Sequence, residues 1–256
     1  MALHLYAGRD RRGSIKEHLK RYGWDCTDVD ILRDGPDMDL LSDAAWERWL
    51  AKIDGRKYGH VHLGTPCTTW SSAREHPGGP AVLRSIEHPM GLPNLRPSER
   101  EEVRKGNVHL ERSIEACRRI TAVGGGFSWE QPEPVDGKPS AFTSPPVVQL
   151  IKETGAKIAR FDQCRFGAET TKPTAVLYSR GGFCILRERC NHPKRSWPLP
   201  DGSTHWGPHR RLWGFRAPDG QWATKQAAEY TSEFAAALAK CIAVIQSPSA
   251  EGFPAP

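Results

Sequence analysis

The sequence contains no long uninterrupted apolar run, and this absence narrows the class of protein. Hydrophobic residues make up 38% of the 256 residues, and no stretch approaches the roughly 20 consecutive apolar residues of a transmembrane helix. The chain also does not open with the charged, apolar and small-residue regions of a secretory signal. We therefore expect a soluble intracellular protein, in the cytoplasm or the nucleus, without a membrane partner.

Closely spaced cysteine pairs are absent as well. The seven cysteines are an odd number and include no CxxC pair, a distribution that argues against a disulfide framework and for a reducing compartment. The chain is long enough for one sizeable domain with a small appendage. Nine tryptophans and eight phenylalanines offset the modest hydrophobic content, because each of them buries a large area.

Acidic residues are too few to balance the basic ones. The 36 Lys and Arg residues against 30 Asp and Glu residues give a formal net charge of +6. A basic surface attracts polyanions, which favours a nucleic-acid partner. Mild basicity is also common among soluble proteins, so the charge serves only as support for this prediction.

The first 32 residues predict a strand, a glycine turn, a helix and a second strand. The first strand runs into Gly8, Ser14 is a suitable N-cap for a helix to about residue 22, and Gly23 ends that helix. The second strand, at about 25–32, carries Asp30 near its end. This order is typical of the βαβ unit that opens a nucleotide-binding sheet.

A second informative stretch reads LGTPCTTWS, residues 63–71, and follows a short apolar run. A strand that stops at Gly64 presents Cys67 at the sheet edge where ligands bind in open α/β proteins. Cys67 is therefore a candidate nucleophile. The alternative is a packed structural thiol, since free cysteine is among the most buried residue types.

A third stretch ends the next predicted strand. A helix over about 98–123 leads through three glycines to a brief strand at 127–129 and then to Glu130-Gln131-Pro132. A carboxyl group at this edge can hold or transfer a proton during a reaction. The alternative is a surface glutamate at a turn.

Together these stretches resemble the cytosine-5 DNA methyltransferases. Gly-x-Pro-Cys-x-x-Trp-Ser resembles the family's catalytic loop, whose thiolate attacks C6 of cytosine, and Glu-Gln-Pro resembles its Glu-Asn-Val or Glu-Asn-Pro signature. Residues 180–222 stand where the family has its target-recognition domain, and their small number resembles the reduced forms of the family found in mobile elements and viruses. The resemblance implies an α/β class I S-adenosylmethionine-dependent methyltransferase fold, with a Rossmann-like sheet, helices on both faces and a small irregular insert.

The resemblance also implies site residues. The catalytic set is Cys67, Glu130, Arg165 and Lys172. Lys172 aligns with the first arginine of a Gln-x-Arg-x-Arg signature, and Arg165 would meet the cytosine O2. The cofactor S-adenosyl-L-methionine would contact the glycine turn, two acids and neighbouring positions, namely Tyr6, Ala7, Gly8, Ser14, Asp30, Asp39 and Pro66. An alternative role for Asp39 is that of a turn or helix-start residue.

Residues 72–100 are rich in Pro, Gly, His and Arg and show almost no periodicity. A long irregular segment beside a candidate nucleophile favours a mobile loop that closes over nucleic acid, and a solvated basic loop is the alternative. The expected nucleic-acid contacts, from this region and from a later insert, are Ser71, Arg74, Arg84, Arg96, Arg210 and Arg211.

Residues 180–222 stand where the family has its target-recognition domain, and they are dense in Arg, Trp, Gly and Pro. An insert of about forty residues is too small for a well-packed domain without help. Zinc could supply it through Cys190, His192, His205 and His209. Their spacing matches no common zinc finger, and histidines in a basic loop also face solvent or phosphate, so the sequence by itself assigns no metal.

The expected organisation is a catalytic core at 1–179, the insert at 180–222, a helix at 223–246 that packs back on the core, and a flexible tail at 247–256. The expected reaction is methyl transfer to C5 of cytosine in DNA by a monomer, through a covalent bond from Cys67 to C6 of a base flipped out of the duplex. The alternatives are RNA as the substrate, another C5 modification, or a catalytically silent nucleic-acid-binding protein, since arginines occupy the cofactor turn at 9–13.

Overall fold

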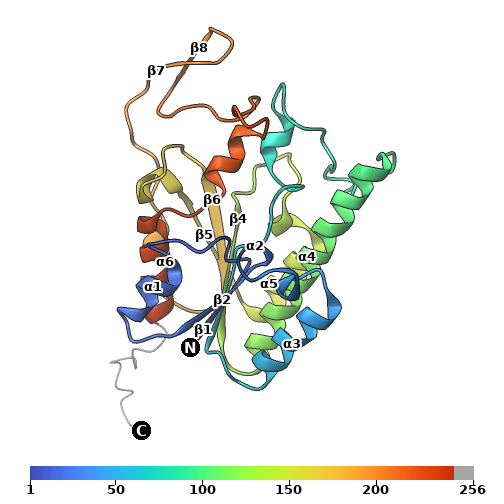
Figure 1. Ribbon diagram of the computed structural model, residues 1–256, viewed down its shortest axis with the longest axis vertical. Helices are drawn as coiled ribbons and strands as arrows, with labels where there is room; N and C mark the ends of the chain where they lie inside the picture. The colour runs from blue at the N-terminus through green and yellow to red at the C-terminus, as the bar shows by residue number, and fades with distance from the viewer. Residues whose placement is uncertain (245–256) are drawn as a thin grey trace.

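A six-stranded sheet crosses the molecule in the order β2-β1-β3-β4-β6-β5 (Figure 1). The strands are β1 Ala2–Leu5, β2 Cys26–Val29, β3 His60–Leu63, β4 Gly126–Pro132, β5 Lys157–Asp162 and β6 Pro173–Tyr178. The first four pair in parallel, and β6 runs antiparallel to both β4 and β5. The computed structural model describes residues 1–244. The predicted tail at 247–256 and the last two residues of the predicted 223–246 helix lie outside the described residues.

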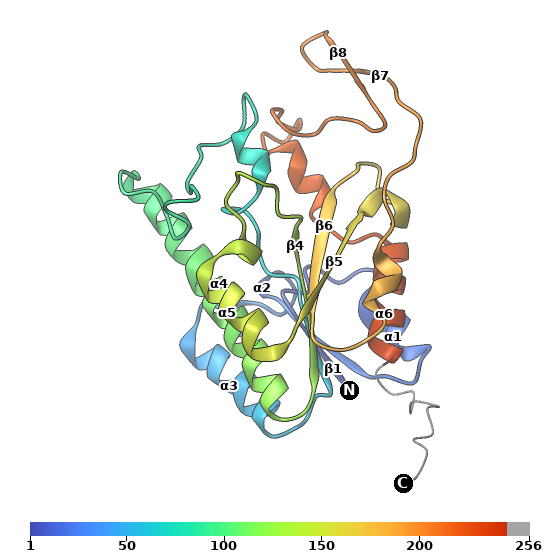
Figure 2. The ribbon, with the colours of Figure 1, turned by 180° about the vertical axis from the view of Figure 1, so that it is seen from behind.

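Helices cover both faces of the sheet, which confirms that part of the prediction. The α-helices are α1 Ile15–Lys20, α2 Ile31–Asp34, α3 Asp43–Asp54, α4 Pro97–Ala122, α5 Pro145–Thr154 and α6 Ser232–Ala243. The 3₁₀ helices are η1 Pro36–Met38, η2 Ser72–Glu75, η3 Ala141–Thr143, η4 Gln163–Phe166, η5 Phe183–Leu186 and η6 Ala223–Ala227. One face carries α1 and α6, and the other carries α3, α4 and α5 (Figures 1 and 2). The architecture is α/β and compatible with a Rossmann-like fold, and no helix within residues 1–244 is both long and apolar enough to cross a bilayer.

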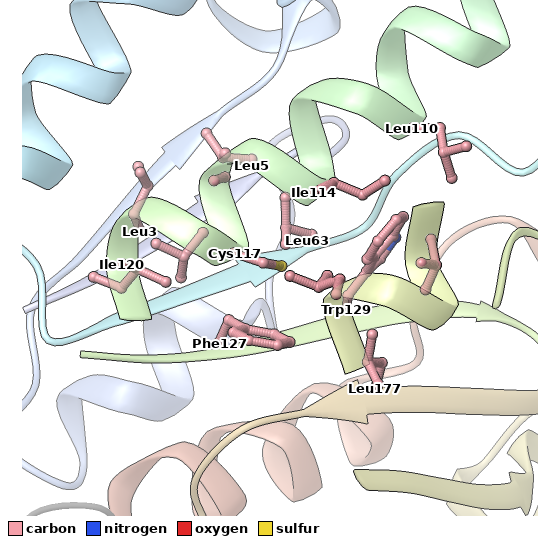
Figure 3. Close-up of a cluster of buried hydrophobic side chains, with 14 of the residues drawn as sticks. Leu3, Leu5, Leu63, Leu110, Ile114, Cys117, Ile120, Phe127, Trp129 and Leu177 are labelled. Atoms are coloured by element: carbon pink, nitrogen blue, oxygen red, sulfur yellow. The ribbon is translucent and has the colours of Figure 1, made fainter. Parts of the chain in front are cut away.

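The alternation of side chains along the strands produces two apolar layers. Leu3 and Leu5 of β1 point to the α3–α4–α5 side, where they join Phe127 and Trp129 of β4 (Figure 3). Phe161 of β5 packs in the opposite layer with side chains of α1 and α6. Each fully buried large apolar side chain stabilises the fold by about 1.5–3 kcal/mol, so these layers hold the sheet and the loops at its edge in place.

The second strand ends earlier than predicted. It stops at Val29, because Asp30 turns its carboxylate back onto the chain and accepts a hydrogen bond from the backbone N–H of Leu32 at 2.8 Å. Asp30 thereby becomes the N-cap of α2. The acid that was predicted near the end of a longer strand therefore lies one residue beyond the strand, at the edge of the sheet.

The predicted C-terminal helix is divided in two. It consists of η6 and, after a break, α6, which begins at Ser232. The break occurs because Thr231 caps α6 and accepts a hydrogen bond from the backbone N–H of Phe234 at 3.1 Å. As a result Tyr230 lies in the break between the two helices, and its side chain is buried.

The segment at 187–222 has no core of its own. Its regular structure is a two-stranded antiparallel ribbon, β7 Arg195–Pro198 and β8 Thr204–Gly207, which projects at the top of Figure 1. Among these 36 positions, all of which the structure describes, only Gly207 is buried. Within the predicted insert at 180–222, Phe183 and Leu186 pack in the layer of α1 and α6, so the part after residue 186 has little apolar packing of its own.

The irregular segment before α4 is anchored by a buried arginine. Arg84 is 1% exposed, and its guanidinium donates to Asn107 Oδ1 at 2.9 Å and to Thr69 Oγ1 at 2.8 Å. The guanidinium also lies 3.7 Å above the Trp70 ring. The prediction that Arg84 contacts nucleic acid is therefore wrong, because its donors are directed into the protein and join this segment to α4.

We expect Arg84→Ala to lower the free energy of unfolding by about 2–4 kcal/mol, since it leaves buried acceptors unpaired and a cavity beside Trp70. Urea unfolding measures the change. Arg104→Ala is the matched control, because Arg104 is exposed and pairs with Glu101 on the surface of α4; it should keep the wild-type midpoint. An unchanged midpoint for Arg84→Ala would contradict the anchoring role.

Candidate active site

A cleft opens at the carboxyl ends of the parallel strands. The chain passes from β1 to β2 on one side and later places β3 on the other side of β1, and ligands bind at such a topological switch point. The loops at 6–11 and 64–68 line a cleft of about 1490 Å³, and η6 and the segment at 208–214 supply other walls. Small-molecule sites commonly have about 300–1,000 Å³, so this cleft has room for more than one small ligand.

The turn after β1 lies at one end of the cleft. The backbone N–H of Gly8 donates to Asp30 Oδ2 at 2.9 Å, which ties the ends of β1 and β2 together. Gly8 has a φ of 73°, and a Cβ built on it meets nothing within 4 Å, so space is open in front of the turn. The residues of the predicted cofactor set that line the cleft are Tyr6, Ala7, Gly8, Asp30 and Pro66.

Two other residues of the predicted cofactor set do not line the cleft. Ser14 accepts a hydrogen bond from the backbone N–H of Glu17 at 3.3 Å and caps α1. Asp39 accepts one from the backbone N–H of Leu41 at 2.9 Å in a local turn. Both side chains thus have local roles in the backbone, which for Asp39 is the alternative that the sequence offered, and their contact with a cofactor stays a prediction.

The loop after β3 holds Cys67 in the cleft. A Cβ on Gly64 would lie 2.9 Å from the Tyr6 carbonyl oxygen, so glycine is required where the two loops approach. Gln131 Nε2 donates to the Thr65 carbonyl at 2.8 Å and fixes the next residue of the loop. Cys67 is half-buried and lines the cleft, in contrast to a thiol packed in the core.

Glu130, at the end of β4, lines the same cleft and is 8% exposed. The Tyr230 hydroxyl donates to Glu130 Oε2 at 3.4 Å, and Gln163 Nε2 donates to Glu130 Oε1 at 3.5 Å. Burial raises the pKa of Glu130, and the positive charge of Lys172 partly opposes this shift. The carboxyl group is therefore protonated more readily than an exposed glutamate.

The thiol of Cys67 responds to the charge of Glu130. Burial raises the pKa of Cys67 to about 11, the negative charge of Glu130 adds to the shift, and Lys172 opposes it. The thiol is thus largely protonated at neutral pH. Neutralising Glu130 favours the thiolate, so the protonation states of the two groups are linked.

The two predicted basic catalytic residues lie in different places. Lys172 lines the cleft, with Nζ 5.9 Å from the Tyr230 ring centroid. The backbone φ of Lys172 is 39°, a conformation that is strained for a residue with a side chain. Residues with such strained backbone angles cluster at functional sites. Arg165 does not line the cleft. Its guanidinium donates to Asn191 Oδ1 at 2.6 Å and pairs with Glu188 instead. This corrects the prediction that Arg165 meets the substrate.

Sequence reasoning missed a hydrogen-bonded chain behind Glu130. Tyr230, which bonds Glu130, also lies 3.4 Å from His62 Nε2, and Ser128 Oγ lies 2.8 Å from both His62 Nδ1 and His60 Nε2. Burial lowers the pKa of His60 to about 3 and that of His62 well below its usual value, so both rings are neutral. The alternation of histidines on a buried strand was the available signal.

Basic side chains gather at the rim of the cleft. The residues of the predicted nucleic-acid set that line it are Ser71, Arg74, Arg96, Arg210 and Arg211. Arg74 donates to the carbonyls of Thr68 and Ala81, each at 2.7 Å, and pairs with Glu102. The Arg211 guanidinium lies 4.3 Å from the Trp213 ring centroid. Arg74 thus shapes the rim through protein contacts, and the Trp213 ring lies between the Arg211 guanidinium and the His76 ring, whose centroid is 3.9 Å away.

The cleft therefore combines a thiol, a buried carboxyl group and a lysine with a glycine turn that carries an acid. Such a set can add a nucleophile to an electrophilic carbon while a carboxyl group controls a proton on the same substrate. A comparison of the chain with models of known protein families and with curated protein sequences finds no match.

Proposed function

We propose that the protein is a class I methyltransferase that transfers a methyl group from S-adenosylmethionine to C5 of cytosine in DNA. The observation that carries this proposal is that Cys67, in the loop after β3, and Glu130, in β4, line one cleft beside the turn of Gly8 and Asp30. The mostly parallel sheet supports it as well, since its switch point lies between β1, which leads into the Gly8 turn, and β3, which leads to Cys67.

The residues beside Gly8 fit a nucleoside cofactor. Asp30 accepts hydrogen bonds from two backbone N–H groups, and its carboxylate keeps further lone pairs for the hydroxyls of a ribose. Tyr6 offers an aromatic surface in the cleft, and the space in front of Gly8 is open. When bound there, S-adenosylmethionine would supply an electrophilic methyl group.

We expect Asp30→Ala to weaken the binding of S-adenosylhomocysteine about 10- to 100-fold, because hydrogen bonds to a charged group contribute about 1.5–3 kcal/mol. Isothermal titration calorimetry measures the Kd. Asp54→Ala is the matched control, since Asp54 is an exposed acid on α3 that pairs with Arg119 and does not line the cleft; its Kd should stay within about twofold of wild type. Equal weakening in both variants would contradict a direct role for Asp30.

In the proposed reaction, Cys67 Sγ forms a bond to C6 of a cytosine that has left the base stack. The electron pair of the C5–C6 π bond moves to C5 and the ring, while protonated Glu130 transfers its proton toward N3 and so stabilises the added charge. Lys172 favours the thiolate before addition. Once C5 carries the methyl group, a base removes the C5 proton, the C6–S bond breaks and Cys67 leaves as thiolate.

Mass spectrometry of nucleosides tests this proposal. The protein is incubated with S-adenosylmethionine bearing a deuterated methyl group and with DNA or RNA, and the polymers are digested to nucleosides. The proposal predicts labelled 5-methyldeoxycytidine from DNA. Label in RNA alone would reassign the substrate, and label in neither polymer, from protein that binds S-adenosylhomocysteine, would contradict catalysis.

A further inference from the structure

Two cysteine and two histidine side chains, which are common metal ligands, converge from three segments of the chain. Cys164 lies in η4, Cys190 and His192 lie at the start of the insert, and His209 follows β8. One ligand atom from each lies within 4.8 Å of the ligand atoms of the other three. The cluster therefore joins the insert to an element of the core.

Two distances around Cys190 have the values expected between ligand atoms of a tetrahedral metal site. Cys190 Sγ lies 3.5 Å from His192 Nδ1 and 3.4 Å from His209 Nε2. Zn–S bonds of about 2.3 Å and Zn–N bonds of about 2.0–2.1 Å place tetrahedral ligand atoms roughly 3.3–3.8 Å apart. These two pairs already have that separation without an ion.

The surroundings of the cluster orient its ligands. His209 Nδ1 lies 3.1 Å from the Glu169 carbonyl oxygen, so Nδ1 donates there and the lone pair of Nε2 faces Cys190. This is the outer hydrogen bond that metal-binding histidines usually make. The backbone N–H of Cys190 donates to Asp162 Oδ2 at 2.8 Å, which attaches the insert to the end of β5.

We propose that Cys164, Cys190, His192 and His209 bind one Zn²⁺ as a closed structural site. Four protein ligands leave no open coordination position, which is typical of structural rather than catalytic zinc. Two thiolates balance the charge of the ion, and the protons of the two thiols leave to solvent when the metal binds. Two thiolates with two imidazoles favour zinc over magnesium or calcium.

The structure changes the ligand set that the sequence suggested. His205, in β8, lines the cleft and is not in the cluster, and Cys164 takes its place. A bound metal would anchor this part of the insert, where apolar packing is scarce, since only Gly207 is buried between residues 187 and 222. Because Arg210 and Arg211 directly follow His209, the metal would hold them at the rim of the cleft. The zinc proposal is independent of the proposed methyl transfer.

Elemental analysis of the full-length protein, purified without chelator, tests this site. We expect about one equivalent of zinc per chain, and less than about a tenth in Cys164→Ser and Cys190→Ser. His205→Ala and Cys184→Ser are the matched controls and should keep the wild-type zinc content. Cys184 is an exposed cysteine outside the cluster, and His205→Ala separates the two ligand sets.

A second measurement covers the case in which a cysteine variant does not fold. Chelator-treated wild-type protein is titrated with Co²⁺, and the proposal predicts the intense visible bands of a tetrahedral cobalt thiolate site and about two protons released per ion. Folded wild-type protein without zinc and without these bands would overturn the site. So would zinc loss in His205→Ala, or a disulfide between Cys164 and Cys190 in protein isolated under reducing conditions.

Discussion

Cys67→Ser will lower methyl transfer at least about 1,000-fold, because a serine hydroxyl of nearly the same size cannot supply an equally nucleophilic thiolate. The Kd for S-adenosylhomocysteine should stay within about threefold of wild type, since the cofactor contacts are assigned to the turn of Gly8 and Asp30 rather than to the thiol. Turnover is measured by methyl incorporation into DNA, and binding by calorimetry.

The control for this prediction is Cys184→Ser. Cys184 is an exposed cysteine in η5 and does not line the cleft, so its replacement should leave turnover unchanged. The thermal midpoint of Cys67→Ser should match that of the wild type, which excludes unfolding as the cause of lost activity. Wild-type turnover in Cys67→Ser would contradict a covalent mechanism.

Glu130→Gln will move two properties of the site in opposite directions. Methyl transfer should fall about 100- to 10,000-fold, because the amide cannot supply the proton at the N3 edge. The reactivity of Cys67 should rise. The negative charge of Glu130 raises the pKa of Cys67, so a neutral amide lowers that pKa and increases the thiolate fraction below about pH 11.

The rate of alkylation of Cys67 by iodoacetamide, followed by peptide mass spectrometry between pH 8 and pH 11, tests the second part of this prediction. At each pH below about 11 the rate should rise in Glu130→Gln and fall in Lys172→Met, because the charge of Glu130 raises the pKa of Cys67 and that of Lys172 lowers it. General damage to the fold would move both variants in the same direction. An unchanged rate in Glu130→Gln would show that the two groups do not interact.

The part of the site that depends on strand order was predictable from the sequence. Loops that follow neighbouring parallel strands meet at one edge of the sheet, so the stretches around Gly8, Cys67 and Glu130 predicted a shared location from their positions after β1, β3 and β4. The glycines and the capping residue between residues 1 and 32 also predicted the strand–helix–strand start of the sheet. These inferences rest on local pattern and on one topological rule.

The remainder depends on contacts between distant segments, which a local pattern does not carry. The burial of Arg84 follows from its fit among Trp70, Thr69 and Asn107, whereas its residue type suggested a solvent-facing role. Tyr230 reaches Glu130 because Thr231 starts a new helix. Cys164 is distant in the sequence from the other three cluster residues. The spacing of nearby cysteines and histidines therefore could not indicate it as a ligand.

Trapping tests the bond from Cys67 to C6 of the cytosine most directly. The substrate is an oligonucleotide in which 5-fluorocytosine replaces cytosine. Fluorine at C5 cannot leave as a cation, so the bond from Cys67 to C6 persists after methyl transfer. The covalent mechanism predicts a protein–DNA adduct that forms only with S-adenosylmethionine present and that maps to Cys67 by peptide mass spectrometry. No adduct on DNA or RNA, or an adduct on a different residue, would contradict it.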